Sequence, residues 1–146
     1  MAALLTWIES TGLATAIAGS RNVTGALSAA HLVGLTLLVG SAIVRCLHGV
    51  GWFLADTPGE VERSTHRGVA IGVTISVVTG LLLWSTRASA ASANGFFQIK
   101  IILIVMALAL QWRMGTMARA KQTLPVLVSL LWFGVVLAGC AFILLE

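Results

Sequence analysis

The sequence predicts an all-α integral membrane protein, a four-helix bundle of membrane spans preceded by an amphipathic helix at the membrane surface. The chain of 146 residues is 58% hydrophobic and only 10% charged, whereas soluble domains carry about 25% charged residues. Its mean hydropathy is +1.00. The apolar residues fall into four long stretches that are separated by short polar segments. At this length, residues 1–146 form a single membrane domain.

Residues 1–20 are the first element, and we expect them to form an interfacial helix. Leu4 and Ile8 share one helical face, whereas polar residues such as Glu9 share another. This distribution is typical of a helix that lies in the plane of the membrane interface. A secretory signal is disfavoured, because the stretch has no basic start and Glu9 interrupts its apolar run.

The first span covers about residues 23–47. From Val23 to Val44 the only side chain that can carry a charge is His31. These 22 residues rise about 33 Å as a helix, close to the ~30 Å thickness of the hydrocarbon core. Counted from Asn22, His31 lies about 13 Å below the outer surface. A titratable side chain at that depth is costly, so His31 is the first candidate functional residue.

Three further apolar stretches complete the bundle, at about residues 68–85, 96–117 and 124–145. The polar segment 56–67 contains a Pro-Gly pair and most of the acidic residues, which predicts a loop. Residues 87–95 are small and polar and show no apolar periodicity, so they are also expected to form a loop.

Small residues recur at every fourth position of the second span, at Gly68, Gly72, Ser76 and Gly80. Such a stripe allows another helix backbone to approach closely. Two interpretations remain open. The stripe packs against a helix of the same chain, or it contacts a second copy or another membrane subunit.

The basic residues predict the orientation in the membrane. Those near one surface are Arg45, Arg63, Arg67, Arg113, Arg119 and Lys121, and those near the other are Arg21, Arg87 and Lys100. The excess of six against three favours cytoplasmic loops after the first and third spans. Both termini of this inner-membrane protein are then expected outside the cytoplasm.

His31 and Lys100 form the first candidate site. Lys100 enters from the same surface as His31, about one helical turn less deep, which a lysine stem can bridge. We expect them to line one polar cavity, where His31 binds a metal or haem iron and Lys100 holds a haem propionate or a quinone oxygen. The alternatives are a hydrogen-bonded packing histidine and a lysine that extends to the interface.

His48 and His66 form a second candidate pair, because they bracket the loop after the first span. Two histidines on facing helices bind b-type haem in four-helix bundles. The alternative is that both are solvated at the interface. The sequence has no Cys-x-x-Cys, no His-Glu-x-x-His and no Gly-rich phosphate loop. Zinc, hydrolase and kinase chemistry are therefore disfavoured, and the sequence does not decide whether the protein is an enzyme.

The sequence resembles a family of small bacterial four-helix membrane proteins of unknown function in Trp7-Ile-Glu9-Ser-Thr11-Gly-Leu13, Ser20, Ala30-His31-Leu-Val-Gly34-Leu-Thr-Leu-Leu-Val-Gly40 and Phe97-Gln-Ile-Lys100. After the first span that family usually has an acidic Asp-Leu-Arg-Leu-Leu-Gly-like stretch, which reads Arg45-Cys-Leu-His48-Gly here. The layout is more distantly similar to the haem-binding membrane protoporphyrinogen oxidases and to copper-resistance D-type membrane domains. The similarity to the oxidases implies that His31 and Lys100 matter for haem.

Two functional hypotheses follow. In the first, the protein is a redox module that binds b-type haem or quinone through His31, Lys100 and the His48/His66 pair. In the second, it is a non-catalytic subunit or assembly partner of a larger membrane complex, which agrees with its small size and few catalytic groups. The expected partners are the lipid bilayer and other membrane subunits or a second copy, and not nucleic acid.

Overall fold

A computed structural model describes residues 2–49, 51–52, 58–116 and 123–144, and the regular structure within them is entirely helical. The prediction of an all-α fold is thus confirmed. The helices are α1 (Ala2–Glu9), α2 (Gly12–Ala18), α3 (Arg21–Gly49), α4 (Pro58–Ser85), α5 (Ala88–Ala93), α6 (Gly95–Thr116) and α7 (Thr123–Leu144). Within these described residues, three stretches can cross a membrane by length and composition, namely Arg21–Gly49, Gly59–Ser85 and Gly95–Arg113, and α7 contains the shorter apolar stretch Leu124–Gly139.

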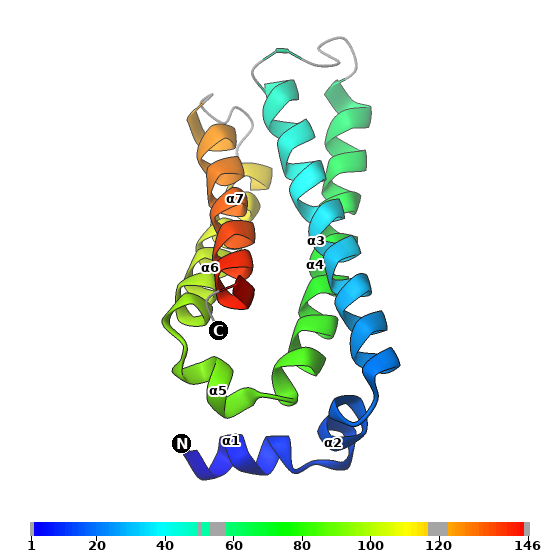
Figure 1. Cartoon of the computed structure of the whole chain (residues 1–146). Coiled ribbons are helices and arrows are strands. Elements are labelled where there is room, and N and C mark those ends of the chain that lie inside the picture. Colours follow the sequence, from blue (N-terminus) through cyan, green and yellow to red (C-terminus); the bar gives the residue numbers. More distant parts are fainter. Residues whose placement is uncertain (1, 50, 53–57, 117–122, 145–146) are drawn as a thin grey trace.

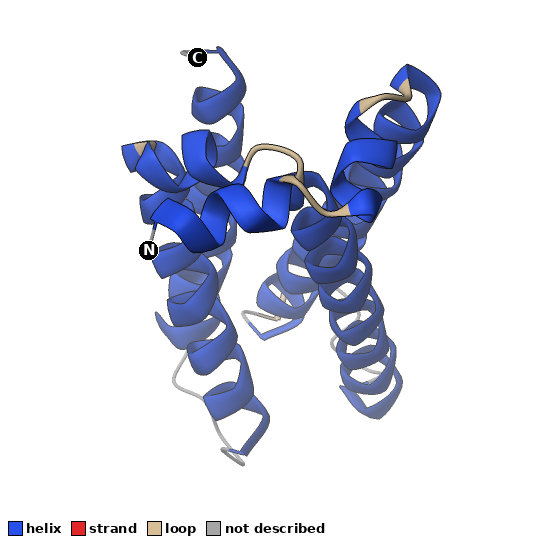
Figure 2. Cartoon of the chain, turned by 90° about the horizontal axis from the view of Figure 1, so that it is seen from below, coloured by secondary structure: helices blue, strands red, loops and turns tan. Residues whose placement is uncertain are grey.

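The long helices form two antiparallel pairs, α3 with α4 and α6 with α7 (Figure 1). The pairs are joined mainly by packing between α3 and α7. Helices α1, α2 and α5 lie across one end of these pairs, and we call them the N-terminal layer. Seen from that end, the chain from the N-terminus crosses from one pair to the other (Figure 2). The layer therefore covers one end of the molecule.

The N-terminal segment is helical as expected, but it forms two helices instead of one. α1 ends at Glu9, and the Thr11 hydroxyl accepts a hydrogen bond from the Ala14 amide at the start of α2. Threonine favours such helix N-caps over helix interiors, because its hydroxyl competes for nearby backbone groups. Leu4 and Trp7 of α1 are exposed, whereas Ile17 of α2 is buried.

Two segments that were predicted as loops are largely helical. α4 begins at Pro58, so most of residues 56–67 extend the second long helix beyond its apolar part. Proline is well tolerated in a first helical turn, and Glu60 in that turn interacts favourably with the helix dipole. Within residues 87–95, the alanine-rich sequence forms the short helix α5, consistent with the high helix propensity of alanine.

The apolar core lies mainly where α3, α6 and α7 meet. Its buried members are Leu38, Ala42, Val69, Ala107, Val128, Trp132 and Val135. Trp132 is the largest and is only 1% exposed. The same cluster contains small residues such as Ala42 and Ala107. This core fixes α6 and α7 against α3 and so sets the position of Lys100 relative to His31.

The small-residue stripe of α4 packs against α3 of the same chain. A Cβ atom added at Gly72 would lie 2.6 Å from the Leu38 amide nitrogen and 2.8 Å from the Gly34 carbonyl oxygen. Gly34 is in turn buried against Ser76, and a Cβ atom added at Gly34 would lie 2.7 Å from the Ser76 hydroxyl oxygen. The interpretation as packing within one chain is therefore confirmed. The face suggested for contact with a second copy or another subunit, which includes Gly68 and Gly80, is occupied by α3.

Candidate functional site

His31 lies between α3 and α4 and is half-buried. Its Nδ1 atom is 3.0 Å from the Thr79 hydroxyl oxygen on α4. The Ser76 backbone, one turn earlier on α4, also lies close to the ring. A Cβ atom added at Gly80 would lie 3.1 Å from the Cε1 atom of the imidazole, so the ring rests directly on the α4 backbone. The cost of burying this polar ring is reduced by the partners that α4 supplies.

Lys100 approaches the same region from α6. Its side chain is half-buried and extends along α7, where its ammonium nitrogen would lie 3.3 Å from a Cβ atom added at Gly139. Its charge acts on His31. The structure thus brings the two residues near each other from different helix pairs. We call His31, Ser76, Thr79, Gly80, Lys100 and Gly139 the His31–Lys100 site.

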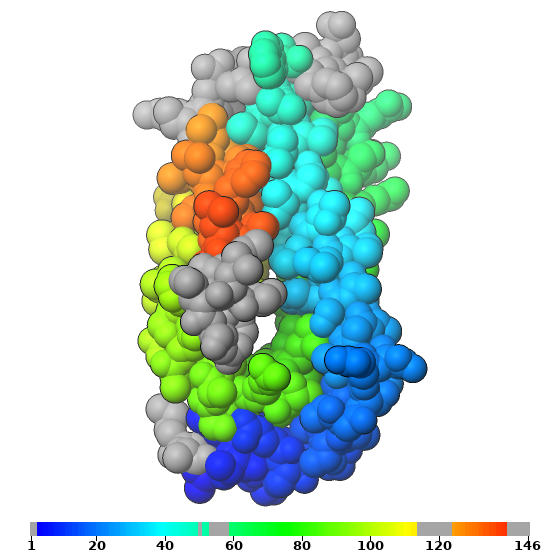
Figure 3. Space-filling view, in the orientation of Figure 1, coloured from blue at the N-terminus to red at the C-terminus, as the bar shows by residue number. Residues whose placement is uncertain are grey.

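The two helix pairs are loosely joined next to this site. Among the described residues, α4 and α6 make no extensive contact, although His31 hydrogen-bonds to α4 and Lys100 belongs to α6. The space-filling view is hollowed between the two pairs, next to the N-terminal layer (Figure 3). The tightly packed core lies farther from that layer. The site therefore combines close packing of α3 on α4 with little packing of α4 against α6.

His48 and His66 lie at the other end of α3 and α4. His48 is half-buried near the end of α3, and His66 is exposed on α4. Because Gly34 faces Ser76 and Leu38 faces Gly72, the same register places His66 about one helical turn, or ~6 Å, from the level of His48. His48 lies 17 residues beyond His31, about 25 Å along α3. One cofactor therefore cannot use both His31 and His48 of a single chain.

Metal-binding side chains do not gather elsewhere in the part of the chain that the structure describes. Among those residues, no group of three or more His, Cys, Asp or Glu side chains could hold a metal ion. A metal bound at His31, or at His48 and His66, would thus need ligands from a cofactor, from water or from another source.

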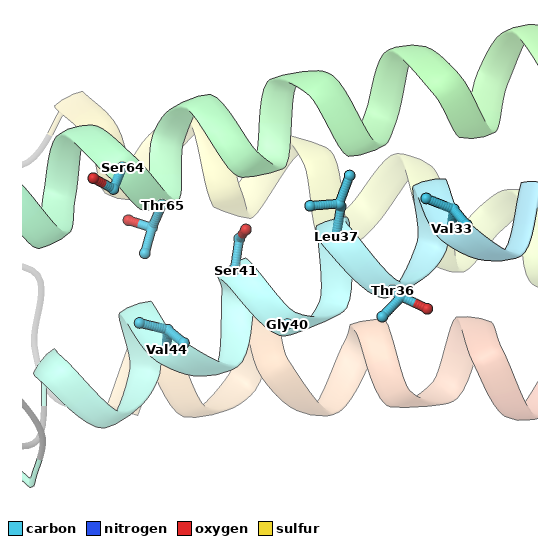
Figure 4. A pocket seen from close by; sticks show the side chains of 8 residues that line it. All are labelled: Val33, Thr36, Leu37, Gly40, Ser41, Val44, Ser64 and Thr65. Atoms are coloured by element: carbon cyan, nitrogen blue, oxygen red, sulfur yellow. The ribbon is translucent and has the colours of Figure 1, made fainter. Parts of the chain in front are cut away.

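A separate groove of about 480 Å³ runs along α3 and α4 (Figure 4). It is lined by Val33, Thr36, Leu37, Gly40, Ser41, Val44, Ser64 and Thr65. None of these side chains titrates near neutral pH, and most of the lining is apolar. Because the groove has no titratable side chain, we place the candidate site at His31 and Lys100.

The N-terminal layer is fixed by a contact that no sequence pattern indicates. The Glu9 carboxylate at the end of α1 accepts hydrogen bonds from the Ser89 amide, at 2.7 Å, and from the Ser89 hydroxyl. These two bonds, first the hydroxyl and then the amide, hold the pKa of Glu9 below its usual value. Nearby, the Trp84 indole donates to the Ser92 hydroxyl at 3.4 Å. These contacts connect α1, α4 and α5.

Sequence reasoning identified His31 and Lys100 but not the residues that surround them. Thr79 and Gly139 were not singled out, and Ser76 and Gly80 were noticed only as members of a packing stripe. The available signal was the spacing on α4, where two hydroxyl residues stand three positions apart and a glycine follows. Residues with that spacing share one helical face.

No protein-family model, curated protein or solved structure matches the chain. The resemblances drawn from the sequence therefore stay expectations.

Proposed function

We propose that this chain is a small four-span membrane protein that binds a redox cofactor, b-type haem or a quinone, at the His31–Lys100 site. The observation that carries the proposal is the approach of an imidazole and an ammonium group from different helices within an apolar bundle. Ionisable groups at membrane depth are costly and usually functional. Two basic groups near each other also favour an anionic or electron-rich ligand between them.

The residues present fit either cofactor. For haem, the Nε2 atom of His31, which is outside the bond to Thr79, would hold the iron, and Lys100 would pair with a propionate. For a quinone, the two side chains would hydrogen-bond to its oxygens. Haem would supply one-electron transfer, and a quinone would carry electrons together with protons. Since His48 lies about 25 Å away, this site offers haem a single histidine of this chain.

The proposal includes α7 as the fourth span and α1 as an interfacial helix. α7 has 22 residues, which rise about 33 Å and can cross the hydrocarbon core. Leu4 and Trp7 expose 64% and 65% of their surface on α1, which lies across the end of the long helices. Exposed apolar and tryptophan side chains are typical of the membrane interface.

Optical spectra of the purified protein test the proposal. We expect haem supplied during expression to give Soret and reduced α bands in the wild type. His31→Ala should abolish these bands, and Lys100→Ala should lower haem occupancy. His66→Ala is the matched control, because His66 is an exposed histidine far from the site, and it should leave the spectrum unchanged.

A quinone ligand is tested with the same purified wild-type and variant proteins. Organic extraction followed by chromatography should recover quinone from the wild type but not from His31→Ala if quinone is the ligand. A wild-type protein that carries neither haem nor quinone after supplementation with each would overturn the proposal. Loss of the bands in His66→Ala alone would move the site to the other end of the bundle.

A second candidate function is that of a non-catalytic subunit or assembly partner in a membrane complex. The weak packing between α4 and α6 favours it, because another subunit could cover the faces left open there. Native mass spectrometry in mild detergent distinguishes the two functions. A stoichiometric complex without cofactor supports the subunit role, and a cofactor-free monomer argues against both.

A further inference from the structure

The Thr79 hydroxyl makes two short contacts but has only one proton to donate. Its oxygen lies 2.6 Å from the Ile75 carbonyl oxygen, one turn earlier on α4, and 3.0 Å from the Nδ1 atom of His31. A hydroxyl donates once and can accept twice, whereas a carbonyl oxygen can only accept. The direction of both hydrogen bonds is therefore determined by where that one proton lies.

The short distance to Ile75 decides the direction. If the Thr79 proton pointed at His31, two oxygen atoms with no proton between them would face each other at 2.6 Å, well inside the usual distance for oxygens that do not share a proton. The hydroxyl therefore donates to the Ile75 carbonyl, as threonines in helices commonly do. Its lone pair is left to accept from His31, so Nδ1 must carry a proton.

We propose that Thr79 is a positioning residue that holds neutral His31 as the Nδ1–H tautomer and so leaves a lone pair on Nε2. Histidines that bind metals usually donate their other N–H to an oxygen, which fixes the tautomer and raises the basicity of the ligating nitrogen.

The use of that lone pair as an iron ligand, or as an acceptor for a quinol proton, rests on the proposed function. The tautomer itself does not. It is a property of the protein without cofactor and can be measured separately.

Nitrogen NMR of the cofactor-free protein labelled with ¹⁵N-histidine tests the inference. We use detergent micelles at a pH where the imidazoles are neutral, and we assign the His31 signals by their loss in His31→Gln. We expect a pyrrole-type resonance for Nδ1 and a pyridine-type resonance for Nε2. In Thr79→Val, which keeps the side-chain shape but removes the hydroxyl, Nε2 should shift toward the pyrrole-type position.

Two further variants separate a specific role from a structural one. Thr79→Ser restores the hydroxyl and should restore the wild-type spectrum. Thr74→Val is the matched control, because Thr74 is exposed on the same helix and bonds its own Ala70 carbonyl at 2.9 Å. It should leave the His31 signals unchanged.

Each contrary outcome has a defined meaning. A pyridine-type Nδ1, or two pyrrole-type nitrogens, in the wild type would overturn the inference even if Thr79→Val fails to fold. An unchanged His31 spectrum in Thr79→Val would show that Thr79 does not set the tautomer. A protein with the expected tautomer that binds neither haem nor quinone would keep this inference and remove the proposed function.

Discussion

Glu9 shows how a single side chain can fix the N-terminal layer. Its carboxylate accepts the Ser89 amide in the first turn of α5, where a negative charge interacts favourably with the helix dipole. α5 has only six residues, too few for a helix that is stable by itself. Neither α2 nor α5 carries a charged side chain. The order of α5 is therefore expected to depend on Glu9.

This dependence predicts an effect of pH. The pKa of Glu9 is lowered, first by the Ser89 hydroxyl and then by the Ser89 amide, so folding favours the ionised form. The resulting stabilisation is present above the ordinary glutamate pKa of about 4.3 and is lost as the pH falls through the lower folded value. Near neutral pH, hydrogen exchange at the Ser89 amide should be slower in the wild type than in Glu9→Gln.

At a pH well below the ordinary pKa of glutamate, the wild type and Glu9→Gln should exchange at the same rate. Glu60→Gln is the control, since Glu60 is an exposed acid in the first turn of another helix, α4. It should leave Ser89 exchange unchanged. Equal exchange of the wild type and Glu9→Gln near neutral pH would show that the carboxylate charge does not hold α5.

Single residues also show what the sequence could and could not predict about the site. His31 was identifiable because it is the only titratable residue in a long apolar stretch. Thr79 was not, because threonines in membrane helices commonly bond their own helix, and the sequence does not say which of them faces another helix. Its role depends on the register of α3 against α4, which is a tertiary property.

At the scale of helices, the α3–α4 pair is the most extensively packed part of the molecule. Close approach requires a residue without a side chain at Gly72, where an added Cβ would meet backbone atoms of α3 at 2.6 and 2.8 Å. Backbone atoms cannot move aside as the end of a flexible side chain can. The pair would have to separate, and the contact between His31 and Thr79 would lengthen.

Gly72→Ala is therefore expected to destabilise the protein by about 1–3 kcal/mol, the usual cost of overpacking. Gly40→Ala is the matched control, because Gly40 lies in the middle of α3 with no atom within 4 Å of an added Cβ. There the change should be neutral or stabilising by about 0.5–1 kcal/mol, as expected for glycine to alanine in a helix. Thermal unfolding in detergent, followed by circular dichroism, measures both. Equal stability of the two variants would contradict the close packing at Gly72.

Helix boundaries were predictable where the hydrophobic stretch and the helix coincide. The third and fourth apolar stretches, at 96–117 and 124–145, agree with α6 and α7 to within a residue at each end. The start of α4 was missed by ten residues, because hydropathy marks the length that fits in a bilayer and not the length of the helix. Its polar first turns need only good helix formers and a favourable start.

For the whole molecule, the arrangement of the helices sorts the basic residues. The far ends of the two antiparallel pairs lie together, away from the N-terminal layer (Figure 1). Arg45, Arg63, Arg67 and Arg113 belong to those far ends, and Arg21 and Arg87 belong to the end that the layer covers. Arg45 forms an ion pair with Glu62 at 3.5 Å. This pair changes the excess of basic residues at the far ends little, because acidic residues contribute weakly to topology.

The last prediction follows from this asymmetry. The far ends should face the cytoplasm, and the N-terminal layer should face outward. Single cysteines at Ala90 on α5 and at Trp52 after α3, both exposed positions, can report it once Cys46 and Cys140 are replaced by alanine. A membrane-impermeant maleimide should label Ala90→Cys in intact spheroplasts, but Trp52→Cys only after permeabilisation.

The reverse labelling pattern would invert the orientation, and equal labelling of both in intact spheroplasts would contradict a chain that crosses the membrane between them. The expected result would place the His31–Lys100 site in the outer half of the bilayer, so that its ligand is reached from the outer leaflet.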